Sequence, residues 1–215
     1  MEKKSSRGNW LAAITALIAW FALIVQLIIL INTASANHMT TLQAIGRFFA
    51  YFTILTNLLV AVNLSFILIS PSSALGKFFS KPPTAAAIAV YILIVGIIYN
   101  ILLRPLWKPE GWQKIADESL HVAVPLLYIL YWFMYASKKG LQWTNALQWL
   151  IYPLVYLFYM LLRGAAEGFY PYPFLSVKEL GYSKTFLNAG GMLIVFVIIG
   201  GIFILVGRRQ VTDRA

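Results

Sequence analysis

Three side-chain types in the sequence could together carry out nucleophilic chemistry: a hydroxyl, an imidazole and a carboxylate. Thr53 lies in one long apolar segment and His121 in another, and Asp117 and Glu118 precede the histidine by four and three residues. Residues three and four apart share a helix face, so either carboxylate can orient the imidazole. A nucleophile, its base and a group that orients the base form the core of many hydrolases. The pattern indicates Thr53 as the nucleophile and His121 as the base.

The same two residues also have a structural interpretation. A threonine in a membrane helix commonly donates its hydroxyl to the carbonyl one turn back. A histidine near a helix end often lies at an interface with its polar atoms satisfied. Composition alone therefore leaves both interpretations open.

Four further residues could assist such chemistry. Asn57 and Asn188 are the candidate donors for a developing oxyanion, and Arg47 and Arg104 could bind the carboxylate of a substrate. The arginines could equally be interface anchors and ion-pair partners. With two histidines and no cysteine in the chain, we expect neither a metal ion nor an organic cofactor.

The elements that must position these residues are transmembrane helices. Of the 215 residues, 60% are hydrophobic and 11% are charged, whereas a soluble domain carries roughly 25% charged residues. A helix that crosses the membrane needs about 20 apolar residues. Six segments qualify, which predicts an all-α integral membrane protein whose residues 1–215 form a single bundle of six transmembrane helices. The expected spans are residues 10–31, 46–69, 84–103, 119–136, 144–162 and 187–206.

The distribution of Lys and Arg predicts the orientation of this bundle. One side collects ten of the 17 basic residues on short loops and tails: Lys3, Lys4, Arg7, Lys77, Lys81, Lys138, Lys139, Arg208, Arg209 and Arg214. The positive-inside rule places that side, and with it both termini, in the cytoplasm. The net charge of +10 is then mostly a topology signal, so nucleic acid is not an expected partner. We expect a multi-pass protein of the plasma membrane.

The first span could also be a secretory signal, since basic residues precede it and Ala34-Ser35-Ala36 follows it. Its apolar run exceeds the usual 7–15 residues, which favours an uncleaved anchor.

In the expected topology, the polar residues within the spans gather in the outer half of the membrane. The candidate site therefore opens toward the outer leaflet.

Three short stretches resemble motifs of the androgen-induced membrane proteins, a family that includes threonine hydrolases of fatty-acid esters of hydroxy fatty acids. They are Phe49-Ala50-Tyr51-Phe52-Thr53-Ile54-Leu55-Thr56-Asn57-Leu58-Leu59, Leu120-His121-Val122-Ala123-Val124-Pro125 and Tyr172-Pro173-Phe174-Leu175. The whole chain resembles related bacterial six-helix membrane proteins of the "Pr-six-Pr" type. It departs from the pattern at two positions: Thr56 stands where relatives carry an acidic residue, and Pro125 lies one position nearer the histidine.

This resemblance implies that Thr53 is the nucleophile and His121 its base, in a hydrolase of carboxylic (fatty-acid) esters that acts on membrane lipids. An intramembrane lipid-ester hydrolase is thus the function that the sequence favours. Two alternatives remain open. The chain could bind or transport a small amphiphile or an ion without catalysis, because polar groups within spans also mark transport paths. It could also be an assembly subunit with no site of its own.

Overall fold

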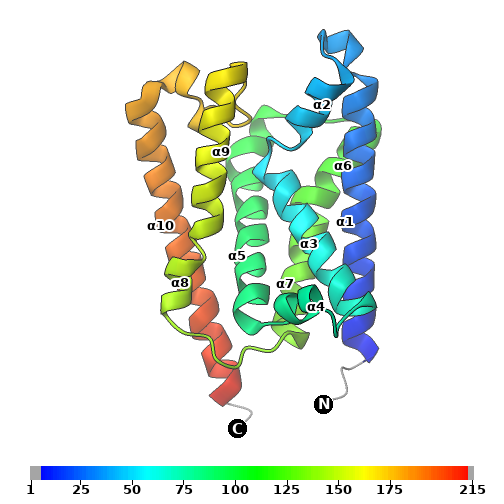
Figure 1. The fold of residues 1–215 in the computed structure, drawn as a ribbon, viewed down its shortest axis with the longest axis vertical. Coiled ribbons are helices and arrows are strands. Elements are labelled where there is room, and N and C mark those ends of the chain that lie inside the picture. The colour runs from blue at the N-terminus through cyan, green and yellow to red at the C-terminus, as the bar shows by residue number, and fades with distance from the viewer. Residues whose placement is uncertain (1–5, 213–215) are drawn as a thin grey trace. The chain divides into compact units, whose positions relative to one another are not determined.

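The computed structural model describes residues 6–212, which are helical and contain no strand. Lys3, Lys4 and Arg214, which contribute to the predicted orientation, lie outside the described residues. The chain divides into two compact units between Lys138 and Lys139 (Figure 1). We describe the two units separately, and the expectation of one single six-helix bundle stays a prediction.

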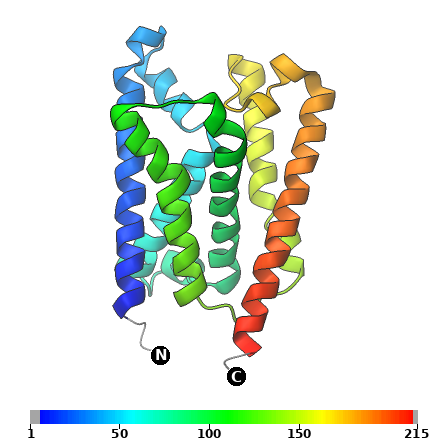
Figure 2. The ribbon, with the colours of Figure 1, turned by 180° about the vertical axis from the view of Figure 1, so that it is seen from behind.

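The first unit is a helical bundle in which α1 (Ser6–Asn32) packs against α2 (Thr41–Phe48), α3 (Phe52–Ile69), α6 (Gly111–Glu118) and α7 (Val124–Tyr135). The helix α5 (Pro82–Ile98) packs against α3 and α7, and the short α4 (Ala74–Phe79) joins α3 to α5 (Figure 2). The buried face of α1 carries small residues every three or four positions, which lets neighbouring backbones approach closely. These residues are Ala12, Thr15, Ala16, Ala19 and Ala22.

Four short helical segments complete the first unit. Two are 3-10 turns, η1 (Ser35–Asn37) and η3 (Arg104–Leu106). The other two are π-helical turns, η2 (Tyr99–Leu103) at the end of α5 and η4 (Ser119–Ala123) between α6 and α7. π-Turns inside α-helices are rare and are frequent at functional sites.

The second unit consists of α8 (Thr144–Gln148), α9 (Ile151–Glu167), the 3-10 turn η5 (Pro173–Leu175) and α10 (Val177–Thr212). The long helix α10 packs against the other three elements. It bends at Gly181, whose φ of 72° is favourable for glycine alone. The helix break between α8 and α9 precedes Pro153, which has no N–H to pair with the carbonyl of Trp149.

Residues 6–212 are all-α, as expected, and five of their helices are long and apolar enough to cross a membrane. They are Ser6–Asn32, Phe52–Ile69, Pro82–Leu106, Thr144–Glu167 and Val177–Thr212. The prediction of one continuous second span over residues 46–69 is wrong, because α2 ends at Phe48 and α3 begins at Phe52. The fourth expected span is not among the five, since the polar α6 and the π-turn η4 leave α7 only 12 residues.

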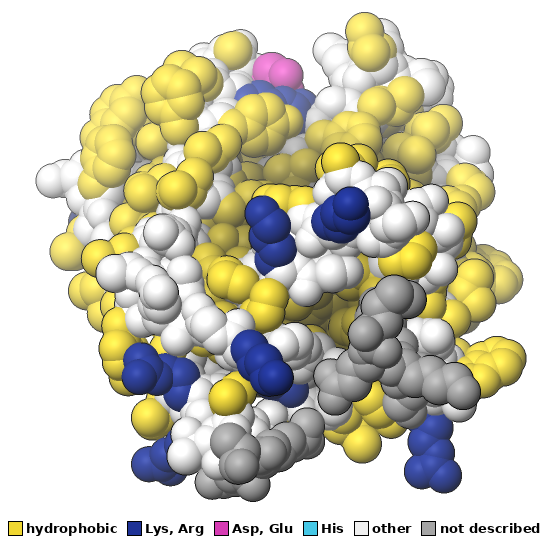
Figure 3. Space-filling view, turned by 60° about the horizontal axis from the view of Figure 1, so that its bottom comes forward, with side chains coloured by type: hydrophobic (Ala, Val, Ile, Leu, Met, Phe, Trp, Pro, Cys, Tyr) yellow, Lys and Arg dark blue, Asp and Glu magenta, His cyan; other side chains and the backbone are white. Residues whose placement is uncertain are grey.

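The two ends of the first unit differ in their polar residues. The end at which α4 joins α3 to α5 carries Lys77 and Lys81, both exposed. Lys and Arg side chains stand among hydrophobic ones on the face that Figure 3 shows. The other end of α5 leads into η2 and η3 and, after a short loop, into α6. This end brings together four of the candidate site residues in two pairs, His121 with Asp117 and Arg104 with Glu118.

Candidate functional site

The centre of the candidate site is the π-turn η4, which carries His121 and contacts α1, α3, α5 and α7. A π-turn contains one residue more than an α-helical turn and leaves backbone carbonyls without their usual donors. Pro125 adds to this effect because it has no N–H. It can pair neither with the carbonyl of Leu120, five residues earlier, nor with that of His121, four residues earlier.

Two asparagine side chains supply the missing donors. The Nδ2 of Asn57, on α3, donates to the carbonyl of Leu120 at 3.1 Å. The Nδ2 of Asn100, on η2, lies 3.4 Å from the carbonyl of His121 and donates to the carbonyl of Gly96 at 2.8 Å. A buried carbonyl left without a donor is costly, so Asn57, whose bond to Leu120 is buried, stabilises the π-turn in its bundle.

Close approach of α5 to η4 depends on Gly96. A Cβ atom at this position would lie 3.3 Å from the carbonyl oxygen of His121 and 3.3 Å from the Cβ of Pro125. Both contacts are tighter than ordinary van der Waals packing. The absence of a side chain at Gly96 therefore lets the two helical segments meet at the level of the histidine.

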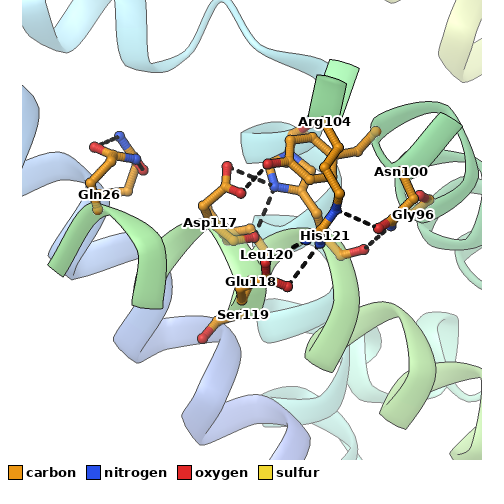
Figure 4. A network of polar contacts seen from close by, with 12 residues as sticks. Gln26, Gly96, Asn100, Arg104, Asp117, Glu118, Ser119, Leu120 and His121 are labelled. Atoms are coloured by element: carbon orange, nitrogen blue, oxygen red, sulfur yellow. Dashed lines mark hydrogen bonds and ion pairs between the residues drawn. The ribbon is translucent and has the colours of Figure 1, made fainter. Parts of the chain in front are cut away.

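His121 lies between an acid and an aromatic ring (Figure 4). Its Nδ1 is 2.9 Å from the backbone carbonyl of Asp117 and 3.3 Å from the carboxylate Oδ1 of the same residue. The hydroxyl of Tyr99 donates to the other carboxylate oxygen, Oδ2. The rings of Tyr99 and His121 are stacked, with centroids 3.7 Å apart and planes 15° from parallel. Of the two carboxylates that the sequence left open, Asp117 is thus the partner of His121.

Glu118 has a different partner. Its two carboxylate oxygens accept from Nη1 and Nη2 of Arg104 at 2.7 and 2.8 Å, while the Nε of Arg104 donates to Oδ1 of Asn100 at 2.9 Å. These hydrogen bonds are the main cause that lowers the pKa of Glu118 below its ordinary value. A substrate carboxylate would have to displace Glu118, so the pairing does not favour the expected clamp role for Arg104.

Thr53 lies in the first turn of α3 and is 7% exposed. Its carbonyl accepts from Nδ2 of Asn57 at 2.9 Å, and the same Nδ2 donates to the carbonyl of Leu120. One side chain thus connects the turn that carries Thr53 to the residue next to His121. The N-terminal position on α3 also gives Thr53 a location where the helix dipole favours negative charge.

The structure corrects the role expected for Asn57. Both N–H groups of its carboxamide are donated to backbone carbonyls, so they do not serve a developing oxyanion. What remains is Oδ1, a buried acceptor without a hydrogen-bond partner among residues 6–212. The amide orientation is fixed, because only the NH₂ side can pair with two carbonyls.

The other two predicted residues lie apart from this network in the chain. Asn188 belongs to α10, in the second unit, where its Nδ2 donates to the carbonyl of Phe174 at 2.8 Å. There it fixes the end of the Tyr-Pro-Phe-Leu stretch. Arg47 lies in the last turn of α2, and its charge acts on the neighbouring Tyr51.

Sequence reasoning assigned no role to Tyr99, Asn100 or Gly96. The signal that could have pointed to them is Pro125, which follows the histidine by four residues and deprives the preceding turn of a donor. A proline at that position predicts that a polar side chain from another helix compensates. Which residue does so depends on the packing of α5.

Among residues 6–212 no group of three or more His, Asp or Glu side chains is arranged to hold a metal ion. Comparison with known proteins adds no functional information, because no protein-family model, curated protein or solved structure matches the chain.

Proposed function

We propose that this protein is a membrane-embedded hydrolase of lipid esters in which Thr53 is the nucleophile and His121 its base. The observation that carries the proposal is the contact of Nδ1 of His121 with Asp117, whose backbone carbonyl lies at 2.9 Å and whose carboxylate Oδ1 lies at 3.3 Å. A carboxylate beside the imidazole is the group that orients the base in such a mechanism. The bridge from Asn57 to the carbonyls of Thr53 and Leu120 supports it further. The resemblance to the androgen-induced membrane proteins suggests the substrate class.

The reaction would proceed in two steps. His121 accepts the proton of the Thr53 hydroxyl while the oxygen adds to the ester carbonyl, and the resulting imidazolium is stabilised by Asp117. Collapse of the tetrahedral intermediate breaks the ester C–O bond, and His121 returns the proton to the departing alkoxide. Water then adds to the carbonyl of the acyl-threonine while His121 takes its proton, and collapse of this second intermediate breaks the acyl bond to the Thr53 oxygen, to which His121 returns the proton. This releases the fatty acid and regenerates Thr53.

The proposal includes a topology. Six transmembrane helices with both termini in the cytoplasm would place the network of η2, η3 and α6 near the outer leaflet of the plasma membrane. Lys77 and Lys81, at the opposite end of the first unit, would then face the cytoplasm, as the positive-inside rule requires. Membrane lipids could enter between helices, because their acyl chains remain in hydrocarbon while the ester reaches the polar residues.

Hydrolysis of a fluorogenic fatty-acid ester by the full-length protein in lipid nanodiscs tests this function. We expect Thr53→Ala and His121→Ala to lose activity by about 100-fold or more, since nucleophile and base are both essential. Thr53→Ser should retain activity because it keeps the hydroxyl. A fluorophosphonate probe should label Thr53 in the wild type.

Two matched variants serve as controls. Thr15→Ala removes another buried helical threonine, whose hydroxyl donates to the carbonyl of Leu11 at 2.7 Å. His38→Gln removes the other histidine, which lies in the turn after η1. Both should hydrolyse the ester at the wild-type rate. Full activity in Thr53→Ala or His121→Ala would exclude the mechanism.

The second candidate function is binding or transport of a small amphiphile or ion without catalysis. One observation favours it: Oδ1 of Asn57 is a buried acceptor without a partner among residues 6–212, and a bound donor would satisfy it. Substrate flux into proteoliposomes, together with absence of hydrolysis and of covalent labelling, would support this function. If alanine substitutions throughout the network changed neither substrate flux nor ester hydrolysis, a role as an assembly subunit would remain.

A further inference from the structure

We propose that Tyr99 is a positioning residue that, together with Asp117, holds neutral His121 in the tautomer with hydrogen on Nδ1. This leaves the lone pair on Nε2, which assigns Nε2 as the nitrogen that accepts a proton. The inference concerns the same site as the proposed hydrolase. It rests on the proposed function only for its catalytic consequence, because the tautomer can be measured without a substrate.

The surroundings of Nδ1 determine where the hydrogen lies. Its nearest neighbour is the backbone carbonyl of Asp117 at 2.9 Å, and a carbonyl oxygen can only accept a hydrogen bond. The carboxylate Oδ1 of Asp117 follows at 3.3 Å and in its ionised form is also only an acceptor. Two acceptors on the same side of the ring require that Nδ1 donates. In a neutral imidazole, the other nitrogen is then without hydrogen.

Tyr99 holds both Asp117 and His121 in place. Its hydroxyl donates to Oδ2 of Asp117, which leaves Oδ1 on the side of the histidine. Its ring stacks on the imidazole at 3.7 Å, so the histidine ring cannot rotate about its χ2 angle without colliding with Tyr99. The side chains of His121 and Asp117 are only 12% and 6% exposed, so water competes little for these contacts.

The two π-turns explain how the rings come to face each other. Tyr99 is the first residue of η2 and His121 the middle residue of η4. An extra residue in a helical turn rotates the side chains that follow it relative to an α-helix. The backbones meet at Gly96, and Asn100 links the carbonyls of Gly96 and His121. Tyr99 is therefore held on the face of the imidazole by its own helix as well as by Asp117.

Nitrogen NMR of the histidine ring tests the proposal directly. The full-length protein with ¹⁵N-labelled histidine and the substitution His38→Gln contains a single histidine, because the chain has only two. In nanodiscs at alkaline pH, where the imidazole is neutral, we expect a protonated Nδ1 and an unprotonated Nε2. A protonated Nε2 in this otherwise unchanged protein would overturn the proposal, and no further variant is needed for that outcome.

Variants of Tyr99 test its own contribution. Tyr99→Phe keeps the ring but removes the hydroxyl, and Tyr99→Leu removes both. We expect the single Nδ1–H population to become a mixture of tautomers in Tyr99→Phe, and a more even mixture in Tyr99→Leu. The control is Tyr128→Phe, which removes another buried hydroxyl that donates to Oδ1 of Asn63 at 2.9 Å and should leave the tautomer unchanged. Unchanged tautomer populations in both Tyr99 variants would overturn the role of Tyr99.

The two proposals can fail separately. An Nδ1–H histidine that responds to Tyr99 in a protein without esterase activity would uphold the positioning role and exclude the hydrolase. If the protein is an active esterase, Tyr99→Phe should lower kcat by about tenfold and leave KM unchanged, since Tyr99 acts through His121 rather than on the substrate. A change confined to KM would contradict that role.

Discussion

At the scale of single residues, the two adjacent acids of the candidate site have different partners. Asp117 and Glu118 are neighbours in the sequence, but Asp117 is buried against His121 and Tyr99, whereas Glu118 pairs with Arg104 at a half-exposed position. Successive residues of a helix point about 100° apart, which separates the two carboxylates. Each carboxylate thereby has its own partner, and only Asp117 is placed to orient the ring of His121.

The ion pair of Glu118 with Arg104 predicts a pH dependence of stability. Arg104 lowers the pKa of Glu118 in the folded protein, so the pair stabilises the fold above the unfolded pKa of about 4.3. This contribution is lost as the pH falls through the lower, folded pKa. Because both side chains are about 40% exposed, Glu118→Gln should cost no more than about 1 kcal/mol at neutral pH.

Thermal unfolding of the wild type and of Glu118→Gln between about pH 2 and pH 8 measures this effect. The two curves should converge at the acid end, where the wild-type carboxyl is also neutral. If the difference in melting temperature between the two proteins stayed the same at acid pH, the ion pair of Glu118 with Arg104 would not be its cause.

At the scale of elements, the π-turn η4 depends on a side chain from another helix. Pro125 leaves the carbonyl of Leu120 without a helical donor, and Asn57 supplies one from α3. The helix α3 begins at Phe52, after the break that follows α2, so Thr53 lies in its first turn and Asn57 lies one turn further on, in contact with η4. The π-turn that carries His121 is therefore linked to the position of Asn57 on α3.

A double-mutant cycle on Asn57 and Pro125 tests this dependence. Asn57→Leu leaves the buried carbonyl of Leu120 without this donor, whereas the carbonyl of Thr53 keeps its helical N–H partner, so the free energy of unfolding should fall by about 1–3 kcal/mol. Pro125→Ala provides a backbone N–H, so Asn57→Leu should cost less in that background. We expect a coupling energy of at least about 0.5 kcal/mol from chemical unfolding in detergent. Strict additivity would show that Asn57 does not compensate for the proline.

At the scale of the whole molecule, the question is how many times the chain crosses the membrane. Five helices within residues 6–212 qualify by length and composition. The helical run from α6 through α7 decides between five and six crossings. It spans roughly 35 Å if it is continuous, at about 1.5 Å per residue, which is enough to cross a bilayer core of about 30 Å.

Cysteine labelling measures the number of crossings, because the chain has no native cysteine. Lys108→Cys and Lys139→Cys place a thiol on the exposed residues that flank the run from α6 to α7, and Lys77→Cys marks the turn at α4. With six spans and cytoplasmic termini, an impermeant maleimide added to intact cells should label only Lys108→Cys. Equal labelling at Lys108 and Lys139 would mean that the run does not cross.

The amino-acid sequence is sufficient to predict an all-α protein and most of its helices. Apolar runs near 20 residues are long enough to satisfy their own backbone hydrogen bonds in lipid, and this constraint is local. Thus α1 and α10 each contain the expected span, and α5 together with η2 covers the expected span 84–103. The sequence also held a local signal for the start of α2, since Thr40 and Gln43 form a capping box.

Which polar groups pair depends on the tertiary structure. The sequence allowed either Asp117 or Glu118 to orient His121, and it suggested Asn57 as an oxyanion donor, although both of its N–H groups pair with backbone carbonyls. Tyr99 and Asn100 acquire their roles because Gly96 lets α5 approach η4, and no local pattern encodes that approach. Hydrogen bonds between residues distant in sequence depend on how helices pack and on where their turns widen, and both follow from the contacts of the whole bundle rather than from neighbouring residues.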